Sequence, residues 1–392
     1  MPNHLKIFFS KSDYLATAAG FFLLGFLFGN WASLIPYIKA TFSLNDASLG
    51  LLLLCLPLGA MSFNPIAARL IQRFGQKRVT IFAIFFISFV YLMPFLASNL
   101  FFLLITLVMV GVGMTLLNIA INMQASILER LHSQFIMSTC HGMFSAGLMI
   151  GSLMRSLTLL LEMNEVTHML CMLGISIVIG LWAAKKISHI HLKQENHAIS
   201  LDKTSKSKKF SLPSGVLLSI IIICICINFT VGSMSDWTSV YMNEIVKTSP
   251  YFVGWGLFGY SFFMALGRFF GDGIIPVYGR NKVLTYGACL SFAGVLTVVF
   301  FPYTISSILG FGMIGLGVSC GAPILYSSAT RISGLTGENG LATMNFYAMA
   351  GFLCGPVIIG FISEATSLPA AFGMIGVLAC IWLYKGAKTI LP

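Results

Sequence analysis

The chain has 392 residues, of which 57% are hydrophobic and only 9% are charged, and its formal net charge is +11. A soluble domain carries roughly 25% charged residues, so this composition excludes an ordinary soluble protein and indicates a bundle of membrane helices. The basic residues lie in particular loops, which favours membrane topology over nucleic-acid binding as the origin of the charge. The nine cysteines fall in apolar segments, which is typical of small core residues rather than disulfide partners.

Apolar segments follow one another along the whole chain. A membrane span needs about 20 mostly apolar residues. The short polar start of the chain predicts a retained first span rather than a cleaved signal peptide. The pattern predicts twelve spans, at 14–38, 48–71, 79–97, 100–128, 135–161, 166–187, 215–246, 251–275, 283–301, 305–332, 341–363 and 369–390. The expected fold class is an all-α membrane protein with six helices in each of two bundles.

Residues 188–213 interrupt this pattern with lysines among Ser, Asn and Gln, a composition that cannot bury a core and predicts a flexible linker. The predicted organisation is therefore an N-terminal six-helix bundle at 1–187, a cytoplasmic linker at 188–213 and a C-terminal six-helix bundle at 214–392. With both termini inside, 19 of the 23 Lys and Arg residues lie on inner loops and tails. Basic residues concentrate on the cytoplasmic side of membrane proteins, so we expect this orientation.

The two halves repeat one another at an offset of about 204 residues. Asn30-Trp31-Ala32-Ser33 is echoed by Asp236-Trp237-Thr238-Ser239, and the glycines Gly147 and Gly151 recur as Gly351 and Gly355. The small-residue pairs are typical of tight helix packing. A membrane protein made of two similar halves has a seam between them, and transporters bind their substrates at that seam.

Asp236 is the first candidate for chemistry, because ionisable side chains inside spans are rare and costly. Next to Trp237, it is either a proton-carrying or substrate-binding carboxylate, or a carboxylate bonded to a neighbouring helix. Its repeat mate is Asn30, so polar groups occupy matching depths on both sides of the seam.

His141 has a polar repeat mate, Asn345, which favours a position facing the central cavity. It is either a proton carrier or an interhelical hydrogen-bonding group. Asn118 and Asn122 are four residues apart and share one helix face, where they either bind substrate hydroxyls or join two helices. The predicted substrate-binding residues are Asn30, Trp31, Asn118, Asn122, His141, Trp237, Asn345 and Tyr347, and the predicted proton-coupling residues are Asp236 and His141.

Arg155 and Arg268 are further cations within predicted spans. Arg155 either reaches the surface beside Glu162 or binds an anionic substrate. Arg268 and Asp272 are spaced for an ion pair near the inner end of span 8, where we expect a gate.

The chain has no phosphate-binding Gly-rich loop, no Ser/His/Asp arrangement and no HExxH motif. ATP drive, an enzyme, a cofactor and a metal site are therefore not expected.

The loop after span 2 carries a specific motif. Arg73, Gly75, Lys77 and Arg78 match in register the signature Gly-x-x-x-Asp-Arg-x-Gly-x-Arg/Lys-Arg/Lys of the major facilitator superfamily, which six plus six spans also resemble. The chain departs from it at Ala68, where the family has Gly, and at Gln72, where the family has an acid that helps to latch the halves. The resemblance implies a gating role for Arg73, Gly75, Lys77 and Arg78, in addition to the gate that spacing predicts at Arg268 and Asp272.

A closer resemblance is to the bacterial branch of the YbjJ-type and MosC-like proteins. It covers nearly the whole chain, through Trp31-Ala32-Ser33, Arg73-Phe74-Gly75, Ala120-Ile121-Asn122, His141-Gly142, Asp236-Trp237 and Gly267-Arg268-Phe269. That branch often has an acid where this chain has Asn118. The resemblance implies a mechanism rather than a particular molecule.

The expected function is secondary active transport of a small polar, perhaps sugar-like, solute across the bacterial inner membrane by alternating access. Proton-coupled uptake by a monomer is the first hypothesis, because the inferred cavity is rich in Asn, Trp and one acid. The alternatives are a proton-driven exporter of an amphipathic metabolite or drug, and a membrane sensor that does not transport. The expected partners are the solute, protons and the lipid bilayer, with no nucleic acid.

Overall fold

The computed structural model describes residues 8–132, 134, 136–187, 215–329, 331 and 337–389, without the side chains of 138, 272, 337–343 and 345. The linker predicted at 188–213 lies outside the described residues. Those residues form helices and no strand. The first half comprises α2 (Ser12–Ser33), α3 (Ile35–Thr41), α4 (Asp46–Leu53), α5 (Cys55–Phe74), α6 (Gln76–Val90), η1 (Met93–Leu96), α7 (Leu100–His132), α8 (Met137–Leu160) and α9 (Glu165–Lys186).

The second half comprises α10 (Gly215–Glu244), η2 (Pro250–Phe252), α11 (Trp255–Tyr278), α12 (Arg280–Phe300), α13 (Thr304–Ser319), α14 (Gly321–Ala329), α15 (Gly337–Ala365) and α16 (Leu368–Lys388). Eleven helices of the described chain are long and apolar enough to cross a membrane. The predicted span 251–275 corresponds to α11, which carries Arg268 and Asp272 and is not among the eleven. The all-α membrane fold is confirmed.

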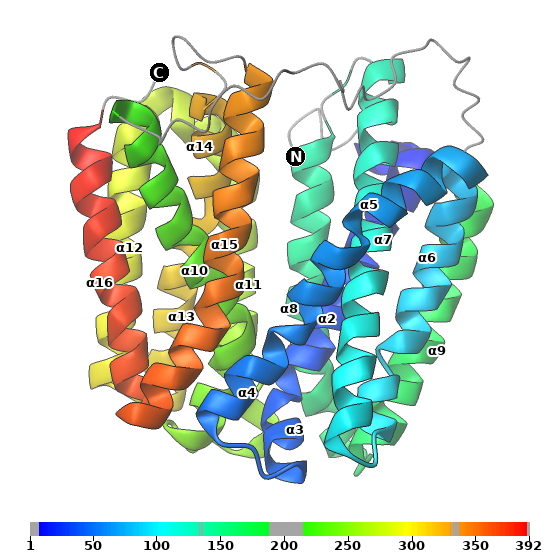
Figure 1. The fold of residues 1–392 in the computed structure, drawn as a ribbon, viewed down its shortest axis with the longest axis horizontal. Helices are drawn as coiled ribbons and strands as arrows, with labels where there is room; N and C mark the ends of the chain where they lie inside the picture. The colour runs from blue at the N-terminus through cyan, green and yellow to red at the C-terminus, as the bar shows by residue number, and fades with distance from the viewer. Residues whose placement is uncertain are drawn as a thin grey trace.

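Both chain ends lie at the same end of the bundle, which we call the terminal end, and α3 and α4 lie at the opposite or far end (Figure 1). The first half occupies one side of the molecule and the second half the other (Figure 1). Polar caps fix where helices begin at the far end. Asn45 accepts a hydrogen bond from the Ser48 amide at the start of α4, and Asn164 does the same for Thr167 at the start of α9.

Glycines set the packing within each half. A Cβ on Gly147 of α8 would lie 2.1 Å from the Phe22 carbonyl oxygen of α2, and one on Gly151 would lie 2.2 Å from that of Phe26. In the second half, Gly351 and Gly355 of α15 lie in the same way against the carbonyls of Ile225 and Phe229 of α10. The sequence repeat is therefore also a structural repeat, in which equivalent helices touch through their backbones.

The turns after α5 and α11 are equivalent as well. Gly75 has φ +84° and ψ 146°, and Gly279 has φ +82° and ψ 152°. Each residue ends one helix and precedes the next with a backbone conformation that side chains with a Cβ rarely adopt. The glycine of the signature motif is therefore required by the turn itself, and the second copy keeps it 204 residues later.

The glycine contacts yield a first prediction. Gly147→Ala places a methyl group against the α2 backbone, so we expect a loss of about 1–3 kcal/mol in stability, as for other overpacked sites. The measurement is the thermal unfolding of the purified protein in detergent. Gly174→Ala in α9 is the matched control, because nothing lies within 4 Å of its Cβ position. Equal melting temperatures for the two variants would contradict the packing argument.

Candidate functional site

A network of charged side chains joins the two halves at the far end. The Lys39 ammonium on α3 donates to Asp46 of α4 at 2.5 Å and to Glu244 of α10 at 2.6 Å. Glu244 belongs to the second half, so one lysine bridges the seam. Burial opposes the charge of Lys39, but hydrogen bonds to Asp46 and Glu244 outweigh it, and the pKa of Lys39 is raised above its ordinary value.

The same network reaches α15. Glu364 accepts hydrogen bonds from the Asp46 amide at 3.0 Å and from the Asn45 side chain at 3.2 Å, and Ser363 donates to the Asp46 carboxylate. Beneath these contacts the helices touch directly, since a Cβ on Gly50 of α4 would lie 3.0 Å from the Pro356 carbonyl oxygen of α15. The far end of the seam is therefore closed by α4 and α15. We call Lys39, Asn45, Asp46, Glu244, Ser363 and Glu364 the far-end network.

A second pair of helices, α8 and α11, also crosses the seam. The Ser156 hydroxyl donates to the Tyr251 carbonyl at 2.5 Å, and a Cβ on Gly254 would lie 2.0 Å from the Ser152 carbonyl oxygen. Toward the terminal end, Arg268 donates to the Ser145 hydroxyl at 2.8 Å. The contact continues to Gly142, where an added Cβ would lie 2.5 Å from the Phe269 ring.

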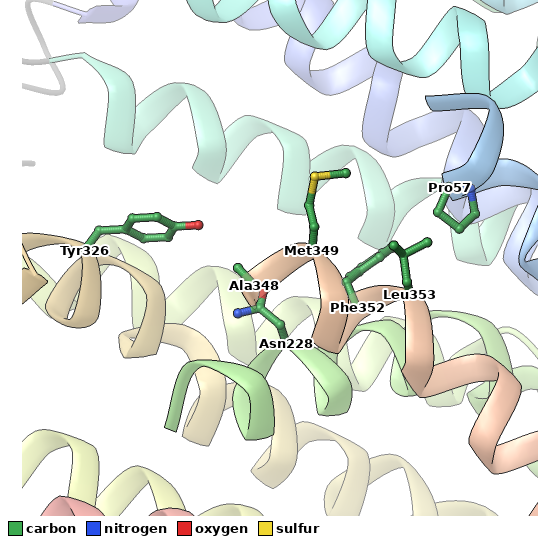
Figure 2. Close-up of a pocket in the computed structure, with 7 residues that line it drawn as sticks. All are labelled: Pro57, Asn228, Tyr326, Ala348, Met349, Phe352 and Leu353. Atoms are coloured by element: carbon green, nitrogen blue, oxygen red, sulfur yellow. The ribbon is translucent and has the colours of Figure 1, made fainter. Parts of the chain in front are cut away.

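A pocket of about 210 Å³ lies where the halves face each other away from the far end. Pro57 comes from α5 of the first half, and the other lining residues come from α10, α14 and α15 of the second (Figure 2). Its polar groups are the Asn228 amide and the Tyr326 phenol, and the rest of the lining is Ala348, Met349, Phe352 and Leu353. The arrangement offers hydrogen bonds at one end and apolar contact at the other.

Asn118 and Asn122 lie on the part of α7 between its contacts with α2 and α5. Asn118 is exposed, and the Asn122 amide donates to its side-chain oxygen at 2.9 Å. Thr115, three residues before Asn118, bonds to the Ala60 carbonyl of α5, and Ile121, next to Asn122, packs against Gly20 of α2. The asparagines are thus bonded to one another, and no hydrogen bond joins either side chain to another helix among the described residues.

His141 is exposed at the seam. Its ring packs edge-on against Phe21 of α2 at 5.1 Å between ring centres, and Arg268 of α11 bonds to Ser145 one turn further along α8. Asp236 is 8% exposed on α10, a helix that contacts α2 and α3 of the first half, and its carboxylate forms no hydrogen bond or ion pair with the described residues.

Three other predicted residues are fully buried. The Asn30 amide donates to the Phe26 carbonyl of its own helix at 2.7 Å. Trp31 packs against Phe95 inside the first half, and its indole N–H has no partner in the described structure. Trp237 donates to the Pro356 carbonyl of α15 at 3.0 Å. These three side chains are held mainly within their own halves.

The remaining predicted residues are placed as follows. Tyr347 is half-buried on α15, while the side chains of Asn345 and Asp272 lie outside the described residues. Arg73, Lys77 and Arg78 surround the Gly75 turn at the terminal end, and none of them forms an ion pair within the described part of the chain. Arg155 pairs with Glu165 at 2.5 Å.

Sequence reasoning missed the far-end network and the pocket residues Asn228 and Tyr326. One signal could have revealed the network. Lys39 and Glu244 are 205 residues apart, so they occupy repeat-related positions and carry opposite charges. A pair of that kind at the ends of equivalent spans indicates a contact across the seam.

The fold and the seam define a class of protein, a membrane transporter built from two six-helix halves. The sequence model of the Major Facilitator Superfamily matches residues 17–246, and the chain belongs to that family. It is 32% identical to an uncharacterized MFS-type transporter of Yersinia pestis, over 94% of this chain and 93% of that protein. It is 26% identical to the membrane protein MosC of Rhizobium meliloti, over 92% and 86% of the two chains. These relatives support the bacterial branch predicted from the sequence.

Solved structures share the fold. The nucleoside transporter NupG superposes with a TM-score of 0.73 at 12% identity, covering 95% of this chain and 98% of NupG. A bacterial homologue of the human lysosomal transporter Spinster, solved in an inward-facing and occupied conformation, gives a TM-score of 0.68 at 13% identity, covering 96% of each chain. The family and fold point to a transporter rather than an enzyme.

The far-end network yields a second prediction. Lys39→Met leaves neighbouring carboxylates without their shared cation, so we expect a loss of about 1–3 kcal/mol in thermal or denaturant unfolding. Lys247→Met, an exposed lysine at the same end, is the control and should change little. Because the pKa of Lys39 is raised on folding, its contribution is complete below the ordinary value of 10.5 and is lost as the pH rises beyond it. A Lys39→Met variant as stable as Lys247→Met would show that the network adds no stability.

Proposed function

We propose that this transporter carries a small polar, sugar-like solute into the cell together with protons, as a monomer in the bacterial inner membrane. The observation that carries the proposal is Asp236, a buried carboxylate at the seam with no bonding partner among the described residues. An unpaired charge is costly in such a place, so a carboxyl group there is suited to taking up and releasing a proton.

The position of Asp236 links proton binding to the motion of the halves. It lies eight residues from Glu244 on the same helix, about 12 Å along the helix axis. Opening the far-end network would therefore expose Asp236 from the outside, and closing it would leave the carboxyl reachable from the other side only. Rocking of the two halves around a midplane site is the general mechanism of such folds.

The solute site proposed here combines residues from both halves. Asn118, Asn122 and His141 carry hydrogen-bonding groups on the first half, and Asn228 and Tyr326 carry them on the second. The Asn228 amide nitrogen donates to the Cys224 carbonyl at 2.9 Å, so its side-chain oxygen is the group proposed to accept from the solute. Tyr347 and Asn345 stay predictions for the same site, as do Asn30, Trp31 and Trp237, whose burial suits a supporting role better than direct contact. Amide and phenol groups match hydroxyl-rich solutes, because each both donates and accepts.

Export of an amphipathic compound is the second candidate. It is favoured by the pocket lining, in which Met349, Phe352 and Leu353 provide apolar contact and flexible shape. The two functions differ in the direction of proton movement relative to the solute, which the test below measures.

Asp236→Asn should abolish solute accumulation driven by a pH gradient while leaving solute exchange largely intact. The reason is that an amide has the size of the carboxyl group but cannot carry the proton. The measurement uses purified protein in liposomes, with a solute first found by a thermal-shift screen of metabolites, since a bound ligand raises the apparent stability. Glu162→Gln removes an exposed acid and serves as the control. Accumulation by Asp236→Asn would transfer the proton role to His141 or remove it.

We also predict that both termini and the linker at 188–213 lie in the cytoplasm. Its basis is the concentration of 19 of 23 basic residues on one side and the placement of both chain ends at one end of the bundle (Figure 1). In a background without native cysteines, an impermeant thiol reagent applied to intact cells should label Asn99→Cys and spare Ser200→Cys. The reverse pattern would overturn the orientation.

A further inference from the structure

Arg268 occupies a central position in the seam. It lies ten residues from Tyr278 and thirteen from Trp255, so it is about 15 Å and 20 Å from the two ends of α11. This places the guanidinium group inside α11, about two to three turns from its terminal end, whereas the sequence predicts a position near the inner end of the span. A cation at that depth is costly and is expected to have a compensating anion.

The described carboxylates do not compensate Arg268. Lys39 pairs with Asp46 and Glu244, and Arg155 pairs with Glu165, but among the described residues Arg268 bonds to the neutral hydroxyl of Ser145 at 2.8 Å and forms no ion pair. A guanidinium group has five N–H donors, so most of them remain available to a ligand. The contrast with the two paired cations marks Arg268 as a binding group rather than a structural one.

His141 lies beside Arg268 on the opposite half. Arg268 bonds to Ser145, which follows His141 by one turn of α8, and the adjacent residues Gly142 and Phe269 are in contact. The His141 side chain is exposed, and its ring nitrogens form no hydrogen bond with the described residues. The His141 ring of the first half and the Arg268 guanidinium of the second half therefore lie at the same part of the seam, where one ligand could contact both.

We propose that Arg268 and His141 bind an anionic oxygen group, a carboxylate or a phosphate, on the transported solute. The proposal rests on the function proposed above and narrows its substrate class to hydroxylated organic anions. Guanidinium groups bind both kinds of oxyanion through paired hydrogen bonds. A monoanion that enters with one proton moves no net charge, so the negative interior of the cell does not oppose its uptake.

The test compares matched pairs of probes on the full-length purified protein at constant ionic strength. The pairs are gluconate with glucitol, and glycerol 3-phosphate with glycerol, which separate the carboxylate from the phosphate source. We expect at least one anion to raise the melting temperature of the wild type by several degrees more than its neutral partner. The proposal is overturned if neither anion does so.

Variants then assign the effect to the site. Arg268→Gln should require an anion concentration about tenfold higher or more for the same shift, because a charge-assisted contact is lost. Arg268→Lys should keep part of the response, and Lys388→Gln, which removes an exposed charge on α16, should keep all of it. An unchanged anion response in Arg268→Gln would overturn the proposal even if the wild type binds anions.

Asp272, four residues after Arg268, is tested separately because its side chain lies outside the described residues. Asp272→Asn should leave the anion response unchanged or strengthen it, and a loss of response would contradict the proposal. If the neutral probes stabilise the wild type and Arg268→Gln equally, the anion site fails while polar-solute transport stands. If no probe of either kind stabilises the protein, both proposals fail together.

Discussion

Direct contact between helix backbones is the constraint on which this structure depends. Lipid tails are as apolar as the helix surfaces, so the hydrophobic effect does not drive spans together, and close packing must do so. Gly147 and Gly151 bring α8 onto the carbonyls of α2, and Gly351 and Gly355 bring α15 onto α10 in the same way. The same kind of contact crosses the seam, where Gly50 of α4 lies against the α15 backbone and Gly254 lies against the α8 backbone.

Much of the fold could be predicted because hydropathy and glycine spacing act locally. Span positions follow from apolar length, and the signature glycine at Gly75 follows from a backbone turn with positive φ. The site was harder to predict, because hydropathy fixes the depth of a residue but not the rotation of its helix. Trp31 has the right depth for the seam and yet packs against Phe95 inside its own half. Lys39 lay in a predicted outer loop, and its bond to Glu244 depends on a contact between spans that no single segment encodes.

The seam combines two kinds of contact with different consequences. At the far end, charged groups and glycines of α4 and α15 hold the halves together. Between α8 and the segment of α11, the hydrogen bonds join neutral groups, except that the Arg268 guanidinium donates to the Ser145 hydroxyl. Neutral hydroxyl and carbonyl contacts can be replaced by similar ones when helices slide, whereas an ion network is either formed or broken. In the rocking motion proposed above, this difference would suit α8 and α11 to the pivot and the far end to a switch between two states.

The composition of the far-end network has a consequence for the medium outside the membrane. It contains three carboxylates, on Asp46, Glu244 and Glu364, and one ammonium group, on Lys39. When the halves part, these groups separate into water as an acidic rim. Dissolved salt screens the repulsion between exposed carboxylates over about 8–10 Å, and divalent cations can bridge them. In the orientation and mechanism proposed above, the ionic composition outside the cell would therefore set part of the balance between the closed and open states, independently of any solute or proton gradient.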